Sequence, residues 1–280
     1  MRLRSPIGYY GGKFYLVKEI LPLIPEHQTY VEVFGGGAQL LFAKPPSPIE
    51  IYNDVDSLLV NFFRVLREPE LFIRFYQKVI WIPFSREEYK ENIENLGKSS
   101  DPVENAVNFF IACRQSFSGT FSGWGFSKTV SRRGMALKTS GYLDIFHILP
   151  LIHQRLFPVQ IENDDFEKII ERYDTENTFF YCDPPYLTET LKTDSPYKFV
   201  FSADDHKRLL DILLKIKGKV LLSGYPSELY KKLEKVWSVK KVERMLSAVT
   251  TSHYKQIECL WYNYETTEEK SSLEKYVQVG

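Results

Sequence analysis

The spacing of apolar and polar positions predicts alternating strands and helices in the N-terminal part of the chain. Apolar residues at helical spacing mark KFYLVKEILPLI, which Pro22 and Pro25 close. TYVEVF alternates as a strand and leads into GGGAQLLFAK, a glycine turn followed by a helix, while PIEIYND is typical of a second short strand. This part of the chain therefore predicts strand, helix and strand in succession.

The same alternation returns in the C-terminal part. Strands are predicted over FPVQIEND, NTFFYCD and KVLLSGY, and helices over FEKIIERY, SADDHKRLLDILLKIKG and SELYKKLEKV. Ser202 is the expected N-cap of the second of these helices. VWSVKKVERML and QIECLWYNY predict a closing pair of strands.

Between these parts, residues 58 to 155 are mostly helical or irregular in pattern. Strand–helix alternation on both sides predicts an α/β fold, with a largely parallel sheet and helices on both of its faces. The helical stretch then interrupts this sheet as an insertion. We predict one domain made of residues 1–57 and 156–280, and an inserted helical domain over residues 58–155.

Charge is informative in its distribution and not in its total. The formal net charge of the 280 residues is zero, so whole-chain electrostatics predict no partner. From Asn105 to Leu143, however, the chain has no acidic residue while it carries five basic ones and several aromatic rings. This stretch indicates either a surface that faces a polyanion or a solvated loop region.

Cysteine usage and the N-terminus bear on the compartment. The three cysteines lie far apart without metal-binding spacing, which favours structural thiols in a reducing compartment. The basic N-terminus lacks an apolar core, and no apolar run approaches membrane-spanning length. We expect a soluble intracellular protein without membrane contact.

A glycine turn supplies the first candidate site. In VEVFGGGAQLLF three glycines stand between a predicted strand and a predicted helix, where backbone can approach a ligand closely. Asp54 ends the next strand about 20 residues on, where nucleotide-binding folds hold ribose hydroxyls. The pattern is not the dinucleotide fingerprint, and Glu32 lies inside the first strand, so a nucleoside site and a plain turn both stay open. Asp56 is an alternative to Asp54, better interpreted as a solvated acid at a helix start.

The second candidate site follows the strand that ends at Cys182. Asp183, two prolines and Tyr186 come next, and prolines cannot continue a sheet ladder. The Asp183 carboxylate and the Pro184 carbonyl are both acceptors, so together they could take the two hydrogens of an exocyclic amine, with Tyr186 stacked on its ring. The alternative is a strand-end turn with a capping aspartate.

Taken in order, the motifs resemble those of the Dam-like group of DNA adenine methyltransferases. They are YYGGKFYLVKEILPLIP, YVEVFGGGAQLLF, YNDVD, NDDFEKII, FYCDPPY, KVLLSGYPSELY and IECLWYNY. The resemblance covers nearly the whole chain. It implies a Rossmann-like catalytic domain with an inserted target-recognition domain, and methyl transfer from S-adenosyl-L-methionine (AdoMet) to the 6-amino group of an adenine flipped out of double-stranded DNA.

The resemblance also assigns residues to the two candidate sites. It implies that the cofactor is contacted by Tyr9, Lys13, Glu32, Phe34, Gly35, Gly37, Asp54, Asp165, Phe166 and Asp183. It implies that the catalytic residues are Asp183, Pro184, Pro185 and Tyr186. Asp164 is interpreted as a solvated neighbour of Asp165 and Cys182 as a buried strand residue. Neither a metal nor a cysteine nucleophile is implied.

For the DNA, the resemblance implies contacts by Arg114, Phe117, Lys128, Arg132 and Arg133. Phe117 would wedge beside the orphan base, although a core aromatic is an equal alternative. Arg132 and Arg133 would read guanines or grip phosphates. The chain has SFSGTFSGWGFSK and SRRGMALK where the best-known GATC-methylating members carry a Tyr-Asn-Gly segment and a different hairpin, so the recognition sequence stays open.

Other functions remain as alternatives. A related enzyme could methylate RNA adenine or a protein glutamine, although such enzymes usually begin the tetrapeptide with Asn. A DNA-binding module without catalysis is a second alternative, and a dehydrogenase is disfavoured by the missing GxGxxG. We expect a monomer that acts on DNA in the cytoplasm of a prokaryotic cell or a phage-infected host, with or without a restriction enzyme.

Overall fold

The computed structural model describes residues 3–9, 15–187, 201–247 and 253–266. Contacts divide the chain into two compact units. Unit 1 consists of Met1–Phe14, Gly35–Pro46 and Glu50–Asp164, and unit 2 of Tyr15–Phe34, Ser47–Ile49 and Asp165–Gly280. Each unit is described by itself.

Seven strands form a mixed, mostly parallel sheet, as the alternating pattern predicts. In chain order they are β1 (Thr29–Glu32), β2 (Ile49–Asn53), β5 (Gln160–Glu162), β6 (Thr178–Cys182), β7 (Lys219–Gly224), β8 (Ser238–Ser247) and β9 (His253–Tyr262), and the order in the sheet is β5-β2-β1-β6-β7-β9-β8. The pairs β2–β5, β1–β6 and β6–β7 are parallel. β9 runs antiparallel to both β7 and β8, which confirms the closing strand pair.

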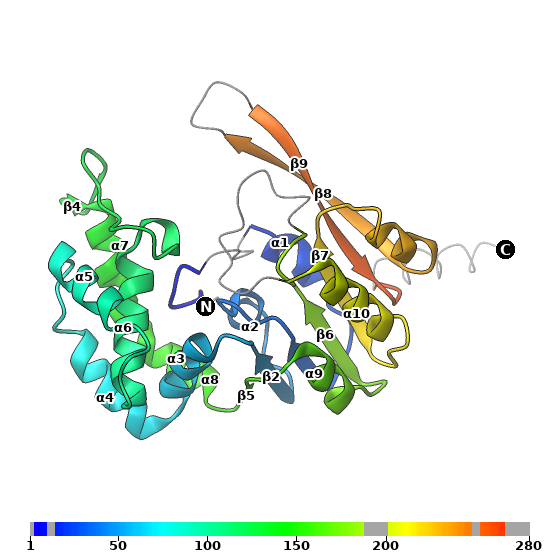
Figure 1. Ribbon diagram of the computed structural model, residues 1–280, viewed down its shortest axis with the longest axis horizontal. Helices are drawn as coiled ribbons and strands as arrows, with labels where there is room; N and C mark the ends of the chain where they lie inside the picture. The colour runs from blue at the N-terminus through cyan, green and yellow to red at the C-terminus, as the bar shows by residue number, and fades with distance from the viewer. Residues whose placement is uncertain (1–2, 10–14, 188–200, 248–252, 267–280) are drawn as a thin grey trace, which may run out of the picture. The chain divides into compact units, whose positions relative to one another are not determined.

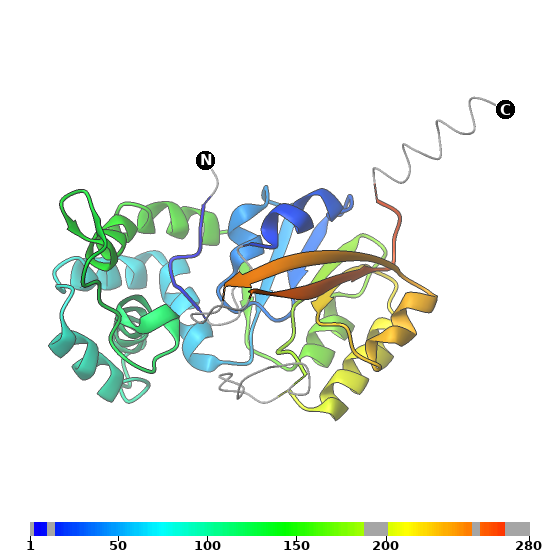
Figure 2. The same cartoon turned by 90° about the horizontal axis from the view of Figure 1, so that it is seen from above.

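The core of unit 2 lies along β6, whose five residues are all buried. In register, Phe180 stands opposite Val31 of β1 and Val220 of β7. Such continuous apolar strands are typical of parallel sheets that are buried on both faces. The long strands β8 and β9 run side by side, orange to red in Figures 1 and 2.

The helical segments of unit 2 are α1 (Val17–Ile20), η1 (Leu21–Leu23), α9 (Phe166–Tyr173), α10 (Ala203–Leu213) and η4 (Tyr230–Lys235). Ser202 caps α10 as expected, in a capping box with Asp205. The helix expected over SELYKKLEKV is instead the 3₁₀ segment η4. Its buried residues Tyr230 and Leu233 are three apart, a spacing that a 3₁₀ helix places on one side.

Unit 1 carries the helix expected after the glycine turn and the helices expected in the middle of the chain. They are α2 (Gln39–Ala43), α3 (Ser57–Arg67), α4 (Pro69–Val79), α5 (Arg86–Glu94), α6 (Pro102–Gln115), η2 (Phe117–Gly119), α7 (Leu137–Phe146) and α8 (Leu149–Leu156), with a short hairpin of β3 (Ser131–Arg132) and β4 (Met135–Ala136). α3, α4, α5 and α7 contact α6, around which they gather in Figure 1. The predicted division into a catalytic and an inserted domain stays a prediction.

The three cysteines are buried thiols, as the sequence predicts. Burial, helped by nearby acids, raises the pKa of Cys259 to about 11 and raises that of Cys182 further. Burial likewise raises the pKa of Cys113 on α6. Among the residues described, none of the helices has the length and apolar character needed to cross a membrane.

Candidate active site

The glycine turn follows β1 and is tied to the end of β2. The Gly35 N–H donates to the Asn53 carbonyl at 2.7 Å, and the Tyr52 hydroxyl donates to the Gly36 carbonyl at 2.8 Å. A Cβ added at Gly35 would overlap the buried Tyr52 ring, and Gly36 has a φ of +47°, which favours glycine. Packing against Tyr52 therefore requires a glycine at position 35, and the backbone conformation favours one at position 36.

Asp54 stands beside this turn with its carboxylate fixed by backbone groups. Oδ2 accepts from the Gly36 N–H and Oδ1 from the Asp56 N–H, each at 2.8 Å. Burial raises the pKa of Asp54 to about 6, although these backbone hydrogen bonds work against the rise. A carboxylate has about four lone-pair sites, so an oriented group of this kind can still accept from hydroxyls of a ligand.

Asp56 is at a helix start as expected, but it is buried and not solvated. Its carboxylate caps α3 by accepting from the Leu58 N–H at 3.1 Å. The Tyr9 hydroxyl donates to the same carboxylate at 3.2 Å. These bonds offset the desolvation of the acid, which the sequence pattern alone did not indicate.

Tyr9 is one of the two residues of the N-terminal motif that the resemblance assigns to the cofactor. Burial, followed by the charges of Asp56 and Asp54, raises the pKa of its phenol well above the usual range. The phenol therefore stays protonated and donates to Asp56. Its ring centroid lies 6.2 Å from that of Phe109 on α6. Lys13 lies outside the described residues.

In unit 2, Phe166, the residue that follows Asp165, belongs to a cluster of three aromatic rings. The ring centroids of Phe34, Phe166 and Phe201 lie 5.4 to 5.7 Å from one another. Glu32, also assigned to the cofactor, is buried and accepts from the Tyr30 hydroxyl at 3.0 Å. Phe34 and Phe166, both assigned to the cofactor by the resemblance, are thus in contact with each other and with Phe201, which the sequence pattern did not indicate. Their contact with a cofactor stays a prediction.

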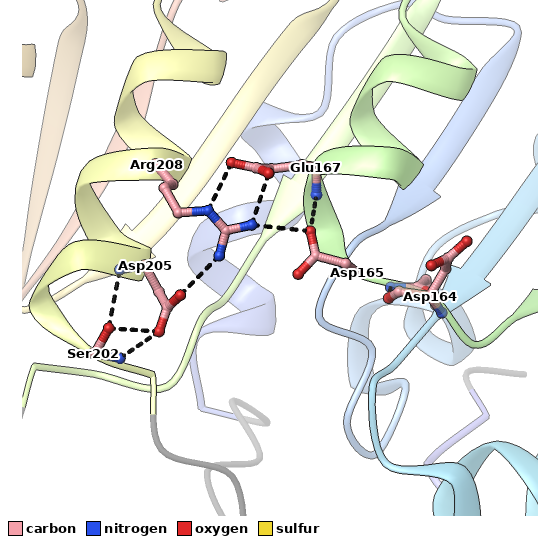
Figure 3. Close-up of polar contacts among 7 residues, drawn as sticks. Asp164, Asp165, Glu167, Ser202, Asp205 and Arg208 are labelled. Atoms are coloured by element: carbon pink, nitrogen blue, oxygen red, sulfur yellow. Dashed lines mark hydrogen bonds and ion pairs between the residues drawn. The ribbon is translucent and has the colours of Figure 1, made fainter.

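The start of α9 is held by a network of charges (Figure 3). The Asp165 carboxylate caps α9 through the Glu167 N–H at 2.9 Å, and Arg208 of α10 reaches it at 3.4 Å. Arg208 also pairs with Glu167 at 2.7 Å and Asp205 at 2.9 Å, and its guanidinium lies 5.0 Å from the Phe166 ring centroid. Asp164 is half-buried and is fixed through its backbone, which exchanges two hydrogen bonds with Asn53. Arg208 therefore fixes the orientation of Asp165, a role that the sequence did not reveal.

The Asp-Pro-Pro-Tyr segment leaves the buried end of β6. The Asp183 carboxylate is half-buried and accepts from the Ser223 hydroxyl at 2.8 Å. Tyr186 is buried, its phenol donates to Glu258, and its ring makes an edge contact with Tyr225 at 4.4 Å between centroids. Pro184 is buried and Pro185 half-buried. The acid and the tyrosine are thus each oriented by a side chain from the neighbouring strands β7 and β9.

The acid-free stretch in unit 1 presents both an aromatic ring and arginines. Phe117 is 63% exposed on η2, so the core-aromatic interpretation is wrong. Arg132 and Arg133 are exposed on the β3–β4 hairpin and both pair with Asp144, the first acid after the stretch. Their contact with DNA stays a prediction.

The other two basic residues assigned to DNA differ in environment. Lys128 is exposed, with its ammonium 5.8 Å from the centroid of the Phe126 ring. Arg114 is largely covered and donates to the Gly141 carbonyl, and burial lowers its pKa. A guanidinium in this position supports α7 from within the unit.

A buried histidine next to the tetrapeptide predicts a pH effect on stability. Burial lowers the pKa of His206 to about 4, against the opposing influence of Asp205 and the Pro185 carbonyl. Because the unfolded chain binds this proton near pH 6.5, the contribution is fully present above pH 6.5 and is lost as the pH falls toward 4. Between pH 7.5 and 5 the loss should be about 2 kcal/mol.

Thermal unfolding at both pH values tests this expectation. The His206→Leu variant should lose less stability on acidification than the wild-type protein does. The same substitution at exposed His147 is the control and should leave the difference between the two pH values unchanged. Equal acid sensitivity of wild type and His206→Leu would contradict the assignment.

Comparisons with known proteins agree with the motifs. The model of the D12 class N6 adenine-specific DNA methyltransferase family matches residues 9–248. The chain is 30% identical over 287 residues to type II methyltransferase M1.LlaDCHI of Lactococcus lactis subsp. cremoris, covering 94% of this chain and 96% of the relative. It is 24% identical over 209 residues to modification methylase StsI of Streptococcus sanguinis, covering 67% of this chain and 29% of that protein. It is 25% identical over 290 residues to type II methyltransferase M.MjaIII of Methanocaldococcus jannaschii, covering 88% and 94%.

Proposed function

The chain belongs to the D12 class of N6 adenine-specific DNA methyltransferases, and on that premise we propose which of its residues carry the reaction. It is an enzyme that methylates adenine in DNA, and it has type II methyltransferases among its relatives. The alternatives of an RNA or protein glutamine methyltransferase and of a DNA-binding module without catalysis are therefore set aside.

The residues of the glycine turn and of the aromatic cluster fit the methyl donor. S-adenosylmethionine, when bound, supplies a methyl group on a positively charged sulfur. The Asp54 carboxylate, already oriented by two backbone N–H groups, would accept from the ribose hydroxyls. Phe34 and Phe166 would pack against the adenine ring, with Asp165 at its amino group. Tyr9, Lys13, Glu32, Gly35 and Gly37 are the other residues that the resemblance assigns to the methyl donor, and it assigns no metal.

The observation that carries the catalytic proposal is the Asp183 carboxylate, held by Ser223 at the end of a buried strand. Asp183 and the Pro184 carbonyl would accept the two hydrogens of the adenine amine. Those bonds turn the nitrogen lone pair away from the aromatic ring and toward the methyl group. Tyr186 would stack on the base, and Pro185 fixes the path of the backbone between them.

The residues between 58 and 155 would recognise double-stranded DNA. A paired adenine is unreachable for the enzyme, so the nucleotide has to be flipped out of the duplex. Phe117, exposed within the acid-free stretch, would fill the gap that the base leaves. Lys128, Arg132 and Arg133 would contact phosphates or guanines, with Arg114 supporting them. The enzyme would act as a monomer, with or without a restriction enzyme.

Methyl transfer from labelled AdoMet to unmethylated plasmid DNA tests the proposal as a whole. Nucleoside mass analysis should find 6-methyladenine, and mapping of the modified sites would give the recognition sequence. Label in RNA or protein but not in DNA would overturn the substrate assignment.

The Phe117→Ala variant should impair base flipping more than duplex binding. The fluorescence rise of 2-aminopurine at the target position should fall by roughly 5-fold or more, since one base–aromatic stack contributes about 1–3 kcal/mol. Affinity for the duplex, measured by anisotropy, should change far less. Phe157, which is 61% exposed outside the acid-free stretch, gives the matched control Phe157→Ala. Unchanged fluorescence in Phe117→Ala would remove the wedge role.

A further inference from the structure

Glu258 is a buried carboxylate in the middle of a strand, directly before a buried apolar run. It lies on β9 between Ile257 and Cys259, and only 2% of its surface is exposed. An ionisable group in such a place is costly unless hydrogen bonds offset the desolvation. The hydrogen-bond donors to Glu258 therefore indicate why a carboxylate is placed here.

Each of its two oxygens accepts from a tyrosine. The Tyr186 phenol donates to Oε1 and the Tyr15 phenol donates to Oε2. Burial raises the pKa of Tyr186 well above its usual range, and the charges of Asp183 and Glu258 add to the rise. The Tyr186 phenol therefore stays protonated and remains a donor to Glu258.

The bond to Glu258 fixes the direction in which the long axis of the Tyr186 ring points. The phenol is fixed at one end, and the ring makes an edge contact with Tyr225, with an interplanar angle of 71°. The hydroxyl lies on the long axis of the ring, so its bond to Glu258 fixes where that axis points, while the edge contact with Tyr225 opposes rotation about the axis. The plane on which a flipped base would stack is thus set by Glu258 and Tyr225 together.

Tyr15, the second tyrosine bound by Glu258, comes from the N-terminal segment of the chain. It is half-buried, and it immediately precedes the buried residues Leu16 and Val17 at the start of α1. Tyr15 also belongs to YYGGKFYLVKEILPLIP, the motif that contains Tyr9 and Lys13. One carboxylate on β9 therefore binds both Tyr186 of the tetrapeptide and Tyr15 of this motif.

We infer that Glu258 is a positioning residue for methyl transfer, which acts by fixing the Tyr186 ring through its phenol. This inference rests on the proposed role of Tyr186 in stacking on the target adenine. Glu258 itself touches neither the base nor the methyl donor in this assignment. Its effect must therefore depend on the Tyr186 hydroxyl.

A double-mutant cycle tests that dependence. Glu258→Gln keeps the size of the side chain but places an amide NH₂ toward one of the two phenols. It should slow single-turnover methyl transfer by roughly 10- to 100-fold, the equivalent of one hydrogen bond to a charged group. The dissociation constant of AdoMet, measured by titration, should change less than about threefold, because the bond acts on the stacking ring. In the Tyr186→Phe background, Glu258→Gln should add less than about a threefold further loss.

A second readout separates positioning from simple structural damage. The 2-aminopurine fluorescence of a flipped target should change in Glu258→Gln and in Tyr186→Phe alike, because a loosened ring stacks less well on the base. Glu50 gives the matched control, since it is a buried carboxylate that pairs with Lys44 and Arg155. Glu50→Gln should lower the melting temperature without changing the transfer rate.

The possible outcomes separate a failure of the Glu258 assignment from a failure of the proposed function, methyl transfer to DNA adenine. Suppose that the wild-type enzyme transfers methyl groups to DNA and that the rate losses of Glu258→Gln and Tyr186→Phe multiply in the double variant. Glu258 then does not act through Tyr186, and the inference fails. If Glu258→Gln loses its fold, the cycle of Tyr15→Phe with Tyr186→Phe tests the same carboxylate, and independent effects there also overturn it. If wild-type enzyme with bound AdoMet leaves DNA adenine unmethylated, the proposed function itself fails.

Discussion

Substituting Asp183→Ala is expected to lower the rate of methyl transfer by roughly 10³-fold or more, the scale of losing an essential acceptor in the transition state. The variant lacks the oxygen that would accept a hydrogen of the adenine amine, so the nitrogen lone pair stays delocalised in the ring. The Ser223 hydroxyl also loses its acceptor at 2.8 Å and retains the Cys182 carbonyl at 3.4 Å. Single-turnover transfer from labelled AdoMet measures the rate, and titration with AdoMet alone measures cofactor binding, which should remain largely intact.

Asp211→Ala is the matched control for this experiment. Asp211 is an exposed carboxylate on α10, so its removal should change neither the rate nor AdoMet binding. Loss of both AdoMet binding and transfer in Asp183→Ala would assign Asp183 to the cofactor and not to the amine. An unchanged rate would remove Asp183 from catalysis.

Substituting Gly35→Ala is expected to weaken AdoMet binding by roughly 10-fold or more and to destabilise the protein by about 1–3 kcal/mol. The added Cβ overlaps the Tyr52 ring, which is fully buried and holds the Gly36 carbonyl through its hydroxyl. Relief of the overlap must move either the ring or the turn, and the turn carries the N–H that orients Asp54. Thermal unfolding and AdoMet titration measure the two effects.

Gly141→Ala separates this clash from the general effect of adding a methyl group. An added Cβ at Gly141 in α7 has nothing within 4 Å, and alanine is favoured over glycine inside a helix by up to about 1 kcal/mol. Stability should therefore stay the same or rise, with AdoMet affinity unchanged. Normal AdoMet binding by Gly35→Ala would mean that the glycine turn is not part of the cofactor site.

The elements of the fold could be predicted because their signals are local. Apolar alternation marks β1 and β2, and a continuous apolar run followed by Asp183 and two prolines marks the end of β6. Ser202 could be placed as a cap because Asp205 follows three residues later. Asp54 and Asp183 could be proposed as site residues for the same reason, because each is a carboxylate directly after a predicted strand.

The partners of these residues could not be predicted, because they come from distant parts of the chain. Ser223 orients Asp183 from β7, and Arg208 reaches Asp165 from α10. Glu258 has a sequence signal, a carboxylate directly before the apolar residues CLW of a predicted strand, but no pattern tells which phenols it contacts. Asp56 is buried and not solvated, and one of its partners, the Tyr9 hydroxyl, comes from 47 residues away in the chain.

The buried thiols give the enzyme internal reporters of local unfolding. A thiol reacts with alkylating reagents as the thiolate, so the high pKa and full burial of these sulfurs suppress the reaction in the closed state. Cys182 directly precedes Asp183 on β6, and Cys259 directly follows Glu258 on β9. Their alkylation rates therefore measure how often the strands beside the tetrapeptide open, while Cys113 on α6 reports on the helices of unit 1.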